Sequence, residues 1–332
     1  MDIIEALERR LAGSALRVAF VEYDDARILE AARYLVDHDI CQPVLVGPAS
    51  QVVASADVAH VALDGIAVFD TSSQERVDEV ARAYAAANDG MSERRALRKA
   101  GDPLAFVAML TATGSADCMA AGVTYSTGDV IVAAQRYIGL DPGVSLVSSI
   151  GYQVVTLGGA QRVLGLADCA VCTDPSPEQL ASIALASARS YAGVFGEEPR
   201  VAMLSYSTKG SGVGGSVDAV TSATALVRER EPRLAVDGEL QLDAALVPEV
   251  AARKVGEDSA VAGRANVLVF PDLNSGNIAV KCMQLFDGGE SFGPMLQGFR
   301  LPVTDFSRSA RTRDVVGNVI LCLLAARGSE RR

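Results

Sequence analysis

Four short segments place hydroxyl, amide and charged side chains where a strand-like apolar run gives way to a helix. In open α/β sheets, ligands bind beyond the carboxyl ends of the strands, so these turns are the first candidates for a site. The four segments are residues 124–128, residues 205–212, residues 270–277 with Lys281, and residues 305–309 with Asp314.

The first two segments are candidate anion sites. Ser126 and Thr127 open a predicted helix, where hydroxyls and free backbone N–H groups suit a phosphate, although from this turn alone an ordinary N-cap is the simpler interpretation. Ser207 and Thr208 lie in a glycine-rich segment that follows a strand. The order G-x-x-x-x-G-K-[ST] is absent there, so a nucleotide-binding P-loop is not predicted, and a flexible connection remains an alternative.

The other two segments add charged groups. Asn277 belongs to a polar turn after an apolar strand, and Lys281 follows at the expected start of a helix, where a cation is unfavourable unless it pairs with an anion. A solvated lysine is the alternative. In the last segment Asp314 follows Ser307 by seven residues, a spacing that in a helix returns to the same face. With Arg308, this set offers a hydrogen-bond donor, an anion clamp and a base; alone, Asp314 also fits a first-turn helix carboxylate.

Apolar runs of strand length alternate with segments of helical period, which predicts βαβ units and mainly parallel sheets. The first part contains strands at 16–21, 43–47, 67–70 and 116–122, with helices at 1–13, 25–37, 102–113 and 127–138 and one that ends at Ala87. Two strand-like runs, 145–157 and 162–171, then meet at Gly158-Gly159, which is a hairpin signal. The second part contains helices at 177–195, 217–228, 244–255, 277–285 and 312–326, with strands at 200–206, 234–236 and 266–270. We therefore predict two α/β/α domains, residues 1–142 with 300–332 and residues 143–299.

The composition excludes several classes of protein. The 332 residues are 49% hydrophobic and 21% charged, which permits a sizeable core. A net charge of −11 provides no basic field for nucleic acid. No run approaches the roughly 18 apolar residues of a membrane-spanning helix, and residues 1–13 lack the apolar segment of a secretory signal. We expect a cytoplasmic protein with no membrane partner, in which Cys169 and Cys172 are buried thiols rather than metal ligands.

Taken together, these turns resemble the phosphate acetyl/butyryltransferase family. The similarity extends from near Ala100 to the C-terminus, with a looser match before it, and includes several long motifs in the same order. The motifs that carry it are residues 168–171, 177–181, 200–210, 237–244, 261–263, 270–278, 293–298 and 302–308.

The resemblance implies a homodimer of two-domain chains with the active site in the cleft between the domains. The expected reaction is reversible transfer of an acetyl group between coenzyme A and inorganic phosphate within a ternary complex. By position, Asp314 resembles the base that takes the thiol proton, Arg308 the phosphate clamp, and Ser307 the group that stabilises the oxyanion. A thiol with a pKa of about 8.5 is mostly protonated at neutral pH, which agrees with a need for a base. Coenzyme A is then a substrate, and neither a bound cofactor nor a metal is expected. The expected substrate-binding residues are Ser126, Thr127, Ser207, Thr208, Asn277, Lys281 and Gln297.

Three departures from the family pattern keep alternatives open. Val132 and Leu285 stand where the family usually has arginines that serve coenzyme A, and Cys118 replaces a glycine. The same reaction on propanoyl or butyryl groups is one alternative. Another is a non-catalytic homologue that senses acetyl-CoA or acetyl phosphate. The missing arginines favour a sensor, whereas a retained base favours an enzyme because a sensor needs none.

Overall fold

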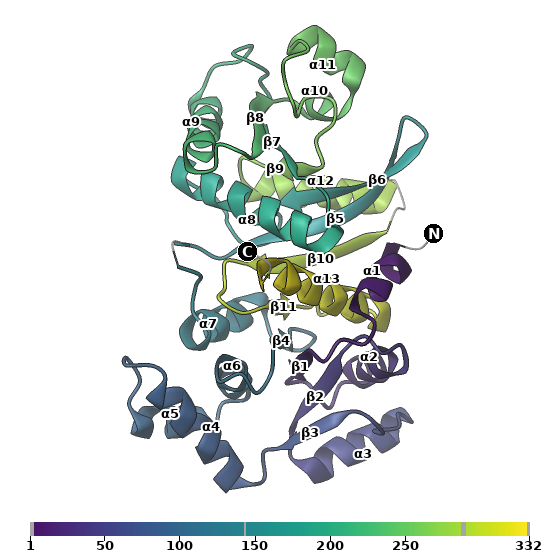
Figure 1. The fold of residues 1–332 in the computed structure, drawn as a ribbon, viewed down its shortest axis with the longest axis vertical. Coiled ribbons are helices and arrows are strands. Elements are labelled where there is room, and N and C mark those ends of the chain that lie inside the picture. The colour runs from purple at the N-terminus through teal and green to yellow at the C-terminus, as the bar shows by residue number, and fades with distance from the viewer. Residues whose placement is uncertain (1–2, 143, 287–289, 331–332) are drawn as a thin grey trace. The chain divides into compact units, whose positions relative to one another are not determined.

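The computed structural model describes residues 3–142, 144–286 and 290–330 and contains two compact units (Figure 1). Unit 1 consists of residues 1–142 and 299–326, and unit 2 of residues 143–298 and 327–332. Both contain parallel strands together with helices, so the predicted α/β class is confirmed. No helix in the described ranges is long and apolar enough to cross a membrane.

The described part of unit 1 contains a sheet in which every neighbouring pair of strands is parallel. Its order is β3-β2-β1-β4-β11. Since the chain runs outward from β1 to β3 and returns to the other side of β1 with β4, a topological switch point lies between β1 and β4. The carboxyl ends of β1, β4 and β11 therefore meet at one edge. The bounds are β1 Arg17–Phe20, β2 Gln42–Gly47, β3 Ala67–Asp70, β4 Cys118–Ala121 and β11 Val303–Asp305.

Polar caps start several helices of unit 1. Asp25 accepts a hydrogen bond from the N–H of Arg27, and Asp102 accepts one from Ala105 just before Pro103, which is a favourable first helical residue. The helices are α1 Ile3–Leu11, α2 Ala26–Asp37, α3 Ala49–Ala59, α4 Gln74–Ala86, α5 Glu93–Lys99, α6 Pro103–Ala112, α7 Thr127–Tyr137 and α13 Thr312–Glu330, of which the last continues past residue 326.

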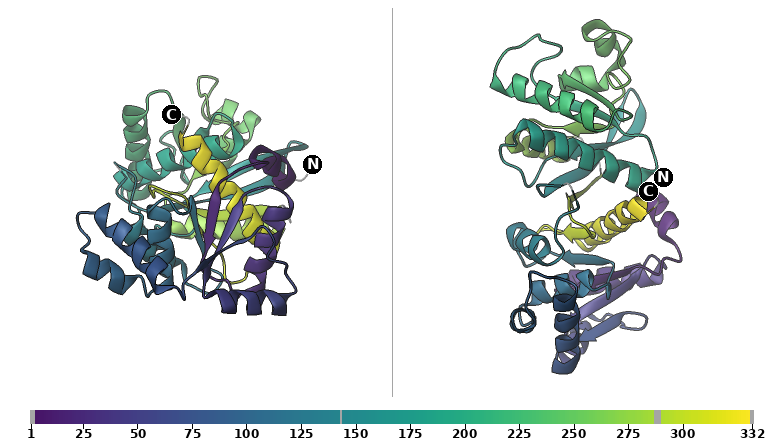
Figure 2. Two further views of the ribbon diagram at one scale, coloured as in Figure 1. Left: turned by 60° about the horizontal axis from the view of Figure 1, so that its bottom comes forward. Right: turned by 60° about the vertical axis from the view of Figure 1, so that its left-hand side comes forward.

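Helix α13, drawn in yellow in Figure 2, supplies much of the core of unit 1, and Sγ of Cys322 on this helix lies 3.3 Å from Sγ of Cys118 on β4. Val315, Val319, Ile320, Leu321 and Leu323 are fully buried. Each such side chain contributes about 1.5–3 kcal/mol when it leaves water. The helix is therefore fixed on the sheet, together with the loop that precedes it.

The described part of unit 2 contains a mixed sheet, with two antiparallel pairs of strands at one side and parallel pairs in the rest. The order is β10-β5-β6-β9-β7-β8, in which β10, β5 and β6 pair antiparallel and the rest pair parallel. The β5–β6 hairpin turns at Gly158 and Gly159, whose φ angles are 59° and 80°, so this prediction is confirmed. The strands are β5 Ser148–Leu157, β6 Ala160–Ala167, β7 Arg200–Leu204, β8 Ala235–Leu240, β9 Val267–Val269 and β10 Ser291–Gln297.

Helices cover both faces of the unit 2 sheet. Tyr152 of β5 meets Tyr191 of α8 on one face, whereas Val155 of β5 lies in a cluster that includes Val280 and Met283 of α12. A capping box at Ser176 starts α8 as a local signal predicts. The helices are α8 Pro177–Phe195, α9 Gly215–Arg230, α10 Leu242–Leu246, α11 Pro248–Lys254 and α12 Leu273–Phe286.

Several predicted elements were wrong or missed. The helix expected at 244–255 is two helices, because Pro248 has no N–H and disfavours the helical conformation of Val247. The strand expected at 234–236 runs to Leu240 through buried acidic residues. The helix expected from Asn277 begins at Leu273. The elements that were not predicted are α3, α5, β10 and β11.

Candidate active site

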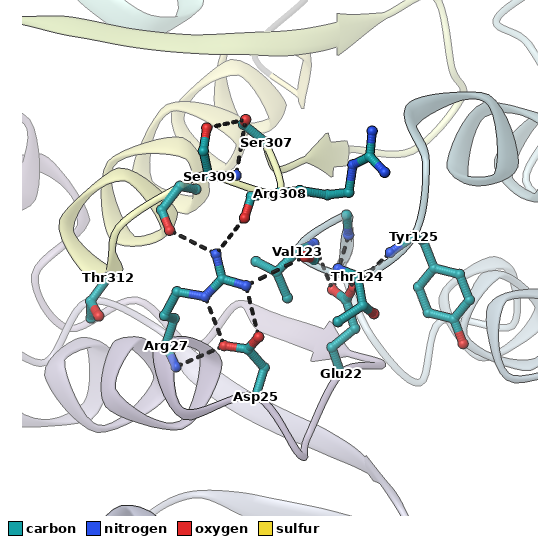
Figure 3. Close-up of polar contacts among 12 residues, drawn as sticks. Glu22, Asp25, Arg27, Val123, Thr124, Tyr125, Ser307, Arg308, Ser309 and Thr312 are labelled. Atoms are coloured by element: carbon teal, nitrogen blue, oxygen red, sulfur yellow. Dashed lines mark hydrogen bonds and ion pairs between the residues drawn. The ribbon is translucent and has the colours of Figure 1, made fainter.

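The turn after β4 folds around a carboxylate from the end of β1. Buried Glu22 accepts hydrogen bonds from the N–H groups of Gly122 at 2.9 Å, Val123 at 3.2 Å and Tyr125 at 3.2 Å, and from the hydroxyl of Thr124 at 2.7 Å (Figure 3). Of the N–H groups that were expected to be free for a phosphate in residues 124–128, those of Thr124 and Tyr125 are already occupied by Glu22. The acceptor that this turn binds is therefore the carboxylate of Glu22, a group of the protein itself, rather than a phosphate.

The hydroxyls at the start of α7 also have partners in unit 1. Ser126 caps the helix, with its Oγ 3.2 Å from the N–H of Asp129 and 2.6 Å from the carboxylate of the same residue. Thr127 donates to Oδ2 of Asp305 at 2.6 Å, which links α7 to the end of β11. The N-cap interpretation of Ser126 is confirmed. Roles for Ser126 and Thr127 in substrate binding stay predictions.

Asp305 is a buried carboxyl group at the point where β11 ends. Its Oδ2 accepts from Thr127, whereas its Oδ1 has no hydrogen-bond partner among the described residues. Burial raises the pKa of Asp305 to about 6, with the hydrogen bond from Thr127 opposing the rise and the charge of Glu22 adding to it. This carboxyl therefore changes charge near neutral pH.

The loop after β11 presents Ser307 and Arg308 to solvent. The side chains of Ser307, Arg308 and Ser309 are exposed, and the hydroxyls of Ser307 and Ser309 lie 2.9 Å apart. Within the described ranges the guanidinium of Arg308 forms no hydrogen bond or ion pair, and in Figure 3 it extends away from Arg27. An exposed guanidinium beside a serine hydroxyl has both the charge and the donors to hold an acyl phosphate.

The backbone of this loop is held by Arg27 from the start of α2. Its Nη1 donates to the carbonyl oxygens of Arg308 and Ala310, both at 2.9 Å, and its Nη2 lies 3.4 Å from the carbonyl of Val123 (Figure 3). The carboxylate of Asp25 pairs with the same guanidinium. Arg27 thus joins the turns that follow β1, β4 and β11.

Asp314 lies in the first turn of α13. Residues 307–311 are not helical, so the helical-spacing argument that linked Ser307 with Asp314 was wrong. Asp314 instead pairs with Arg311, and burial alone would raise its pKa. Hydrogen bonds from the side chain and N–H of Arg311 outweigh burial, so the pKa lies below its ordinary value. Asp314 is therefore ionised at neutral pH.

In unit 2, the loop after β7 folds around Glu239 of β8. Oε1 of Glu239 accepts from the hydroxyl of Ser207 at 2.9 Å and from the N–H of Gly210 at 2.7 Å. Burial alone would raise the pKa of Glu239, but these hydrogen bonds lower it below its ordinary value. Thr208 is buried and bonds Gln241 at 3.2 Å. The side chains of Ser207 and Thr208 thus have partners within unit 2, and their contact with substrate stays a prediction.

The remaining predicted residues also lie in unit 2. Asn277 donates to the carbonyl of Cys169 at 3.1 Å, and exposed Lys281 lies 3.2 Å from Gln284. Lys281 sits well inside α12, so the argument that placed it at a helix start was wrong. Gln297 is buried, and its amide bonds the hydroxyls of Ser148 on β5 and of Ser187 and Ser190 on α8. Substrate contacts by Asn277, Lys281 and Gln297 stay predictions.

Sequence reasoning gave no role to Glu22, Asp25, Arg27, Asp305 or Glu239, although Asp305 and Glu239 lie within segments that it had selected. An indicative signal was present, because residues 22–27 form an acid-rich turn with one arginine directly after the first strand. Glu239 had a weaker signal, an acidic residue within a strand-forming segment. The carboxylates of Glu22 and Glu239 act alike, since each accepts hydrogen bonds from a turn after a neighbouring strand.

No group of three or more histidine, cysteine, aspartate or glutamate side chains in the described part of the chain is arranged to hold a metal ion. Charged side chains instead gather at strand ends, beside a topological switch point in unit 1. Ligands of open α/β sheets bind at such a point.

Comparisons with known proteins identify the family. The family model for phosphate acetyl/butaryl transferases matches residues 2–323, and the chain belongs to this family of acyltransferase enzymes. The phosphate acetyltransferase of Treponema pallidum (strain Nichols) is 38% identical over 338 residues, which covers 99% of this chain and all of that protein. The phosphate acetyltransferase of Bacillus subtilis (strain 168) is 37% identical over 315 residues, 95% of this chain and 96% of that protein. The crystal structure of a phosphotransacetylase from Streptococcus pyogenes is 35% identical and has a TM-score of 0.89, covering 99% of this chain and 98% of that one.

Proposed function

We propose that this chain is a phosphate acetyltransferase, which catalyses acetyl-CoA + phosphate = CoA + acetyl phosphate. Membership of the family and full-length relatives of that name support the proposal. The structural observation that carries it is the loop after β11, which exposes Ser307 and Arg308 while its backbone is tied to α2. Asp314 follows in the next turn.

In the direction of thioester synthesis, Asp314 takes the proton of the coenzyme A thiol. The resulting thiolate attacks the carbonyl carbon of acetyl phosphate, so a C–S bond forms and the carbonyl oxygen becomes an oxyanion. When the carbonyl re-forms, the bond between carbon and the bridging oxygen breaks, and phosphate leaves with that electron pair. The ionised state of Asp314 at neutral pH fits this task, because a base must be unprotonated before it accepts a proton.

Arg308 and Ser307 stabilise the charge that develops during this transfer. The guanidinium of Arg308 offers two parallel N–H groups to the phosphoryl oxygens, and its charge favours the departing phosphate. The hydroxyl of Ser307 donates to the oxyanion, an interaction that strengthens in the transition state. Both side chains are exposed, so a substrate reaches them without displacing a protein partner other than the hydroxyl of Ser309.

The proposal also covers how the substrates bind and in which oligomeric state and compartment the enzyme works. Coenzyme A and acetyl phosphate are substrates that bind together in a cleft, no bound cofactor takes part, and the enzyme works as a cytoplasmic homodimer. Support for self-association comes from exposed apolar side chains on α12, where Ile278 is 60%, Leu285 78% and Phe286 83% exposed. Apolar groups of this size on one helix favour burial against another surface.

The test is thioester formation by purified protein from coenzyme A and a panel of acetyl, propanoyl and butyryl phosphate, without added metal. We expect the highest kcat/KM with acetyl phosphate. A higher value with propanoyl or butyryl phosphate would reassign the substrate. No turnover with any of the three, combined with measurable binding of acetyl-CoA, would reject the enzyme and support a sensing homologue.

A further inference from the structure

We propose that Arg27 is a positioning residue for the reaction centre, and that it holds the loop of residues 307–310 by its backbone so that Ser307 and Arg308 face the substrate. This inference rests on the proposed function. Arg27 lies in the first turn of α2 and is 281 residues before Arg308 in the chain, yet its guanidinium contacts the carbonyl of that residue directly.

All five N–H groups of this guanidinium have partners. Nε and Nη2 donate to the two carboxylate oxygens of Asp25 at 2.9 and 2.8 Å. The two N–H groups of Nη1 serve the carbonyls of Arg308 and Ala310, and the remaining one of Nη2 points to the carbonyl of Val123. Since an arginine has five N–H donors and no more, none is left for an anionic substrate in this arrangement. Arg27 therefore acts through the loop rather than by contact with phosphate.

Asp25 keeps the guanidinium in place. Its carboxylate also caps α2, because Oδ1 accepts from the N–H of Arg27 at 2.9 Å. The hydrogen bond from the side chain of Arg27 lowers the pKa of Asp25, against the opposing effect of burial. The side chains of Arg27 and Asp25 are only 28% and 17% exposed, so solvent weakens this pair less than a fully exposed one. The planar guanidinium of Arg27 is held on one side by the carboxylate of Asp25 and donates on the other side to the carbonyls of residues 308 and 310. It therefore determines where these two carbonyls lie.

The geometry requires an arginine at this position. Lysine carries a single ammonium group on a flexible chain, and such a group does not hold the carboxylate of Asp25 and the two loop carbonyls in one plane. Arg27→Lys therefore keeps the positive charge but loosens the loop. Catalytic loops are sensitive to such changes, since a misplacement of about 1 Å costs up to roughly 100-fold in rate.

The same helix contains a matched control. Arg33 also clamps two carbonyls of a loop, those of Ala62 at 3.2 Å and Asp64 at 2.6 Å, and it pairs with a carboxylate of its own helix, Asp37. Its side chain is 22% exposed, close to the value for Arg27. The loop that it clamps lies between α3 and β3, away from the turns after β1, β4 and β11. Arg33→Lys thus repeats the chemical change without touching the loop of residues 307–310.

The experiment compares Arg27→Lys and Arg33→Lys with the unmodified protein in steady-state kinetics with acetyl phosphate and coenzyme A. We expect Arg27→Lys to lower kcat about 10- to 100-fold with little change in either KM, because the lost alignment matters most in the transition state. Arg33→Lys should leave kcat unchanged. Asp25→Asn should lower kcat less than Arg27→Lys, and the double variant should lose less than the product of the two single effects.

A second measurement follows the loop itself. Hydrogen exchange of the Ala310 amide, which bonds the carbonyl of Ser307 at 2.8 Å, should accelerate in Arg27→Lys and not in Arg33→Lys. Equal effects of the two variants on kcat and on this exchange would overturn the positioning role. If the unmodified protein forms no thioester, the proposed function fails; the exchange comparison still decides whether Arg27 holds the loop.

Discussion

Asp314 and Arg311 form a two-point ion pair at the start of α13, with Nη2 of Arg311 3.0 Å from Oδ1 and Nε 3.1 Å from Oδ2 of Asp314. The N–H of Arg311 donates to the same Oδ2 at 2.9 Å. The side chain of Arg311 is 81% exposed, so water competes for it and the pair opens at small energetic cost. Arg311 thus keeps Asp314 ionised and oriented.

The first prediction concerns Asp314 as the base. Asp314→Asn should lower kcat by about 100- to 10,000-fold, the usual contribution of a positioned acid–base group, and should change both KM values little. Steady-state kinetics with acetyl phosphate and coenzyme A provide the measurement. Asp218→Asn is the matched control, because Asp218 is an exposed first-turn carboxylate on α9. Equal kcat values for the two variants would remove Asp314 from the mechanism.

The second prediction uses the partner of that base. Arg311→Gln removes the guanidinium, whose hydrogen bonds and charge lower the pKa of Asp314, and keeps only the backbone N–H of residue 311 as a donor, so this pKa should rise. A base works only when unprotonated, and the acidic limb of the kcat/KM profile should therefore move to higher pH. The profile is measured between pH 4 and 8 for both proteins. An unmoved limb would show that another group controls it.

The third prediction concerns the stability of the fold at Asp305. Its pKa of about 6 exceeds the ordinary value because of burial, so the folded chain binds this proton more tightly than the unfolded chain. Stability from this group is complete below about pH 4 and is lost as pH rises to about 6, with a total near 3 kcal/mol at most. Asp305→Asn has no titrating proton at this position and does not lose this contribution. The unfolding free energy of Asp305→Asn minus that of the unmodified protein should therefore be larger at pH 8 than at pH 4.

Urea unfolding at several pH values measures this difference. The difference in unfolding free energy between the two proteins isolates Asp305, since the other titrating groups are shared. Glu22 is the charged group that acts on it from β1, and Thr127 is the donor from α7. A difference that stays constant from pH 4 to 8 would contradict the raised pKa.

Local signals in the sequence predicted much of the fold. The hairpin at Gly158-Gly159 follows from two residues that adopt positive φ, and α8 follows from Ser176, Pro177 and Gln179 at its start. Strand β11 has no such signal, because three residues become a strand only by pairing with β4, far away in the chain. The start of α12 was misplaced since Asn274 and Ser275 resemble turn residues when read alone.

The candidate site also contains residues that the sequence predicted and residues that it did not. Ser307, Arg308 and Asp314 lie close together in the chain, so the family motif selected them as candidates even though the helical-spacing argument was wrong. Arg27 and Glu22 were missed because their partners are more than 90 residues away, and only the folded sheet brings them together. The same reason explains why free N–H groups were expected after β4, where Glu22 supplies the anion.

The last prediction concerns the missing arginines. Val132 is 62% exposed on α7, so an arginine fits there without disturbing the core. If this position faces coenzyme A, Val132→Arg adds a charge-assisted hydrogen bond of about 1.5–3 kcal/mol, equivalent to roughly a tenfold or greater gain in affinity. The KM for coenzyme A should fall, and that for acetyl phosphate should stay the same because Arg308 is unchanged.

Val58→Arg is the control, since Val58 is an 83% exposed valine on α3. The account of the departures is rejected if Val132→Arg has no effect while Arg98→Ala, on α5, raises the KM for coenzyme A. In that case the basic residues of α5 already perform the role that Val132 lacks.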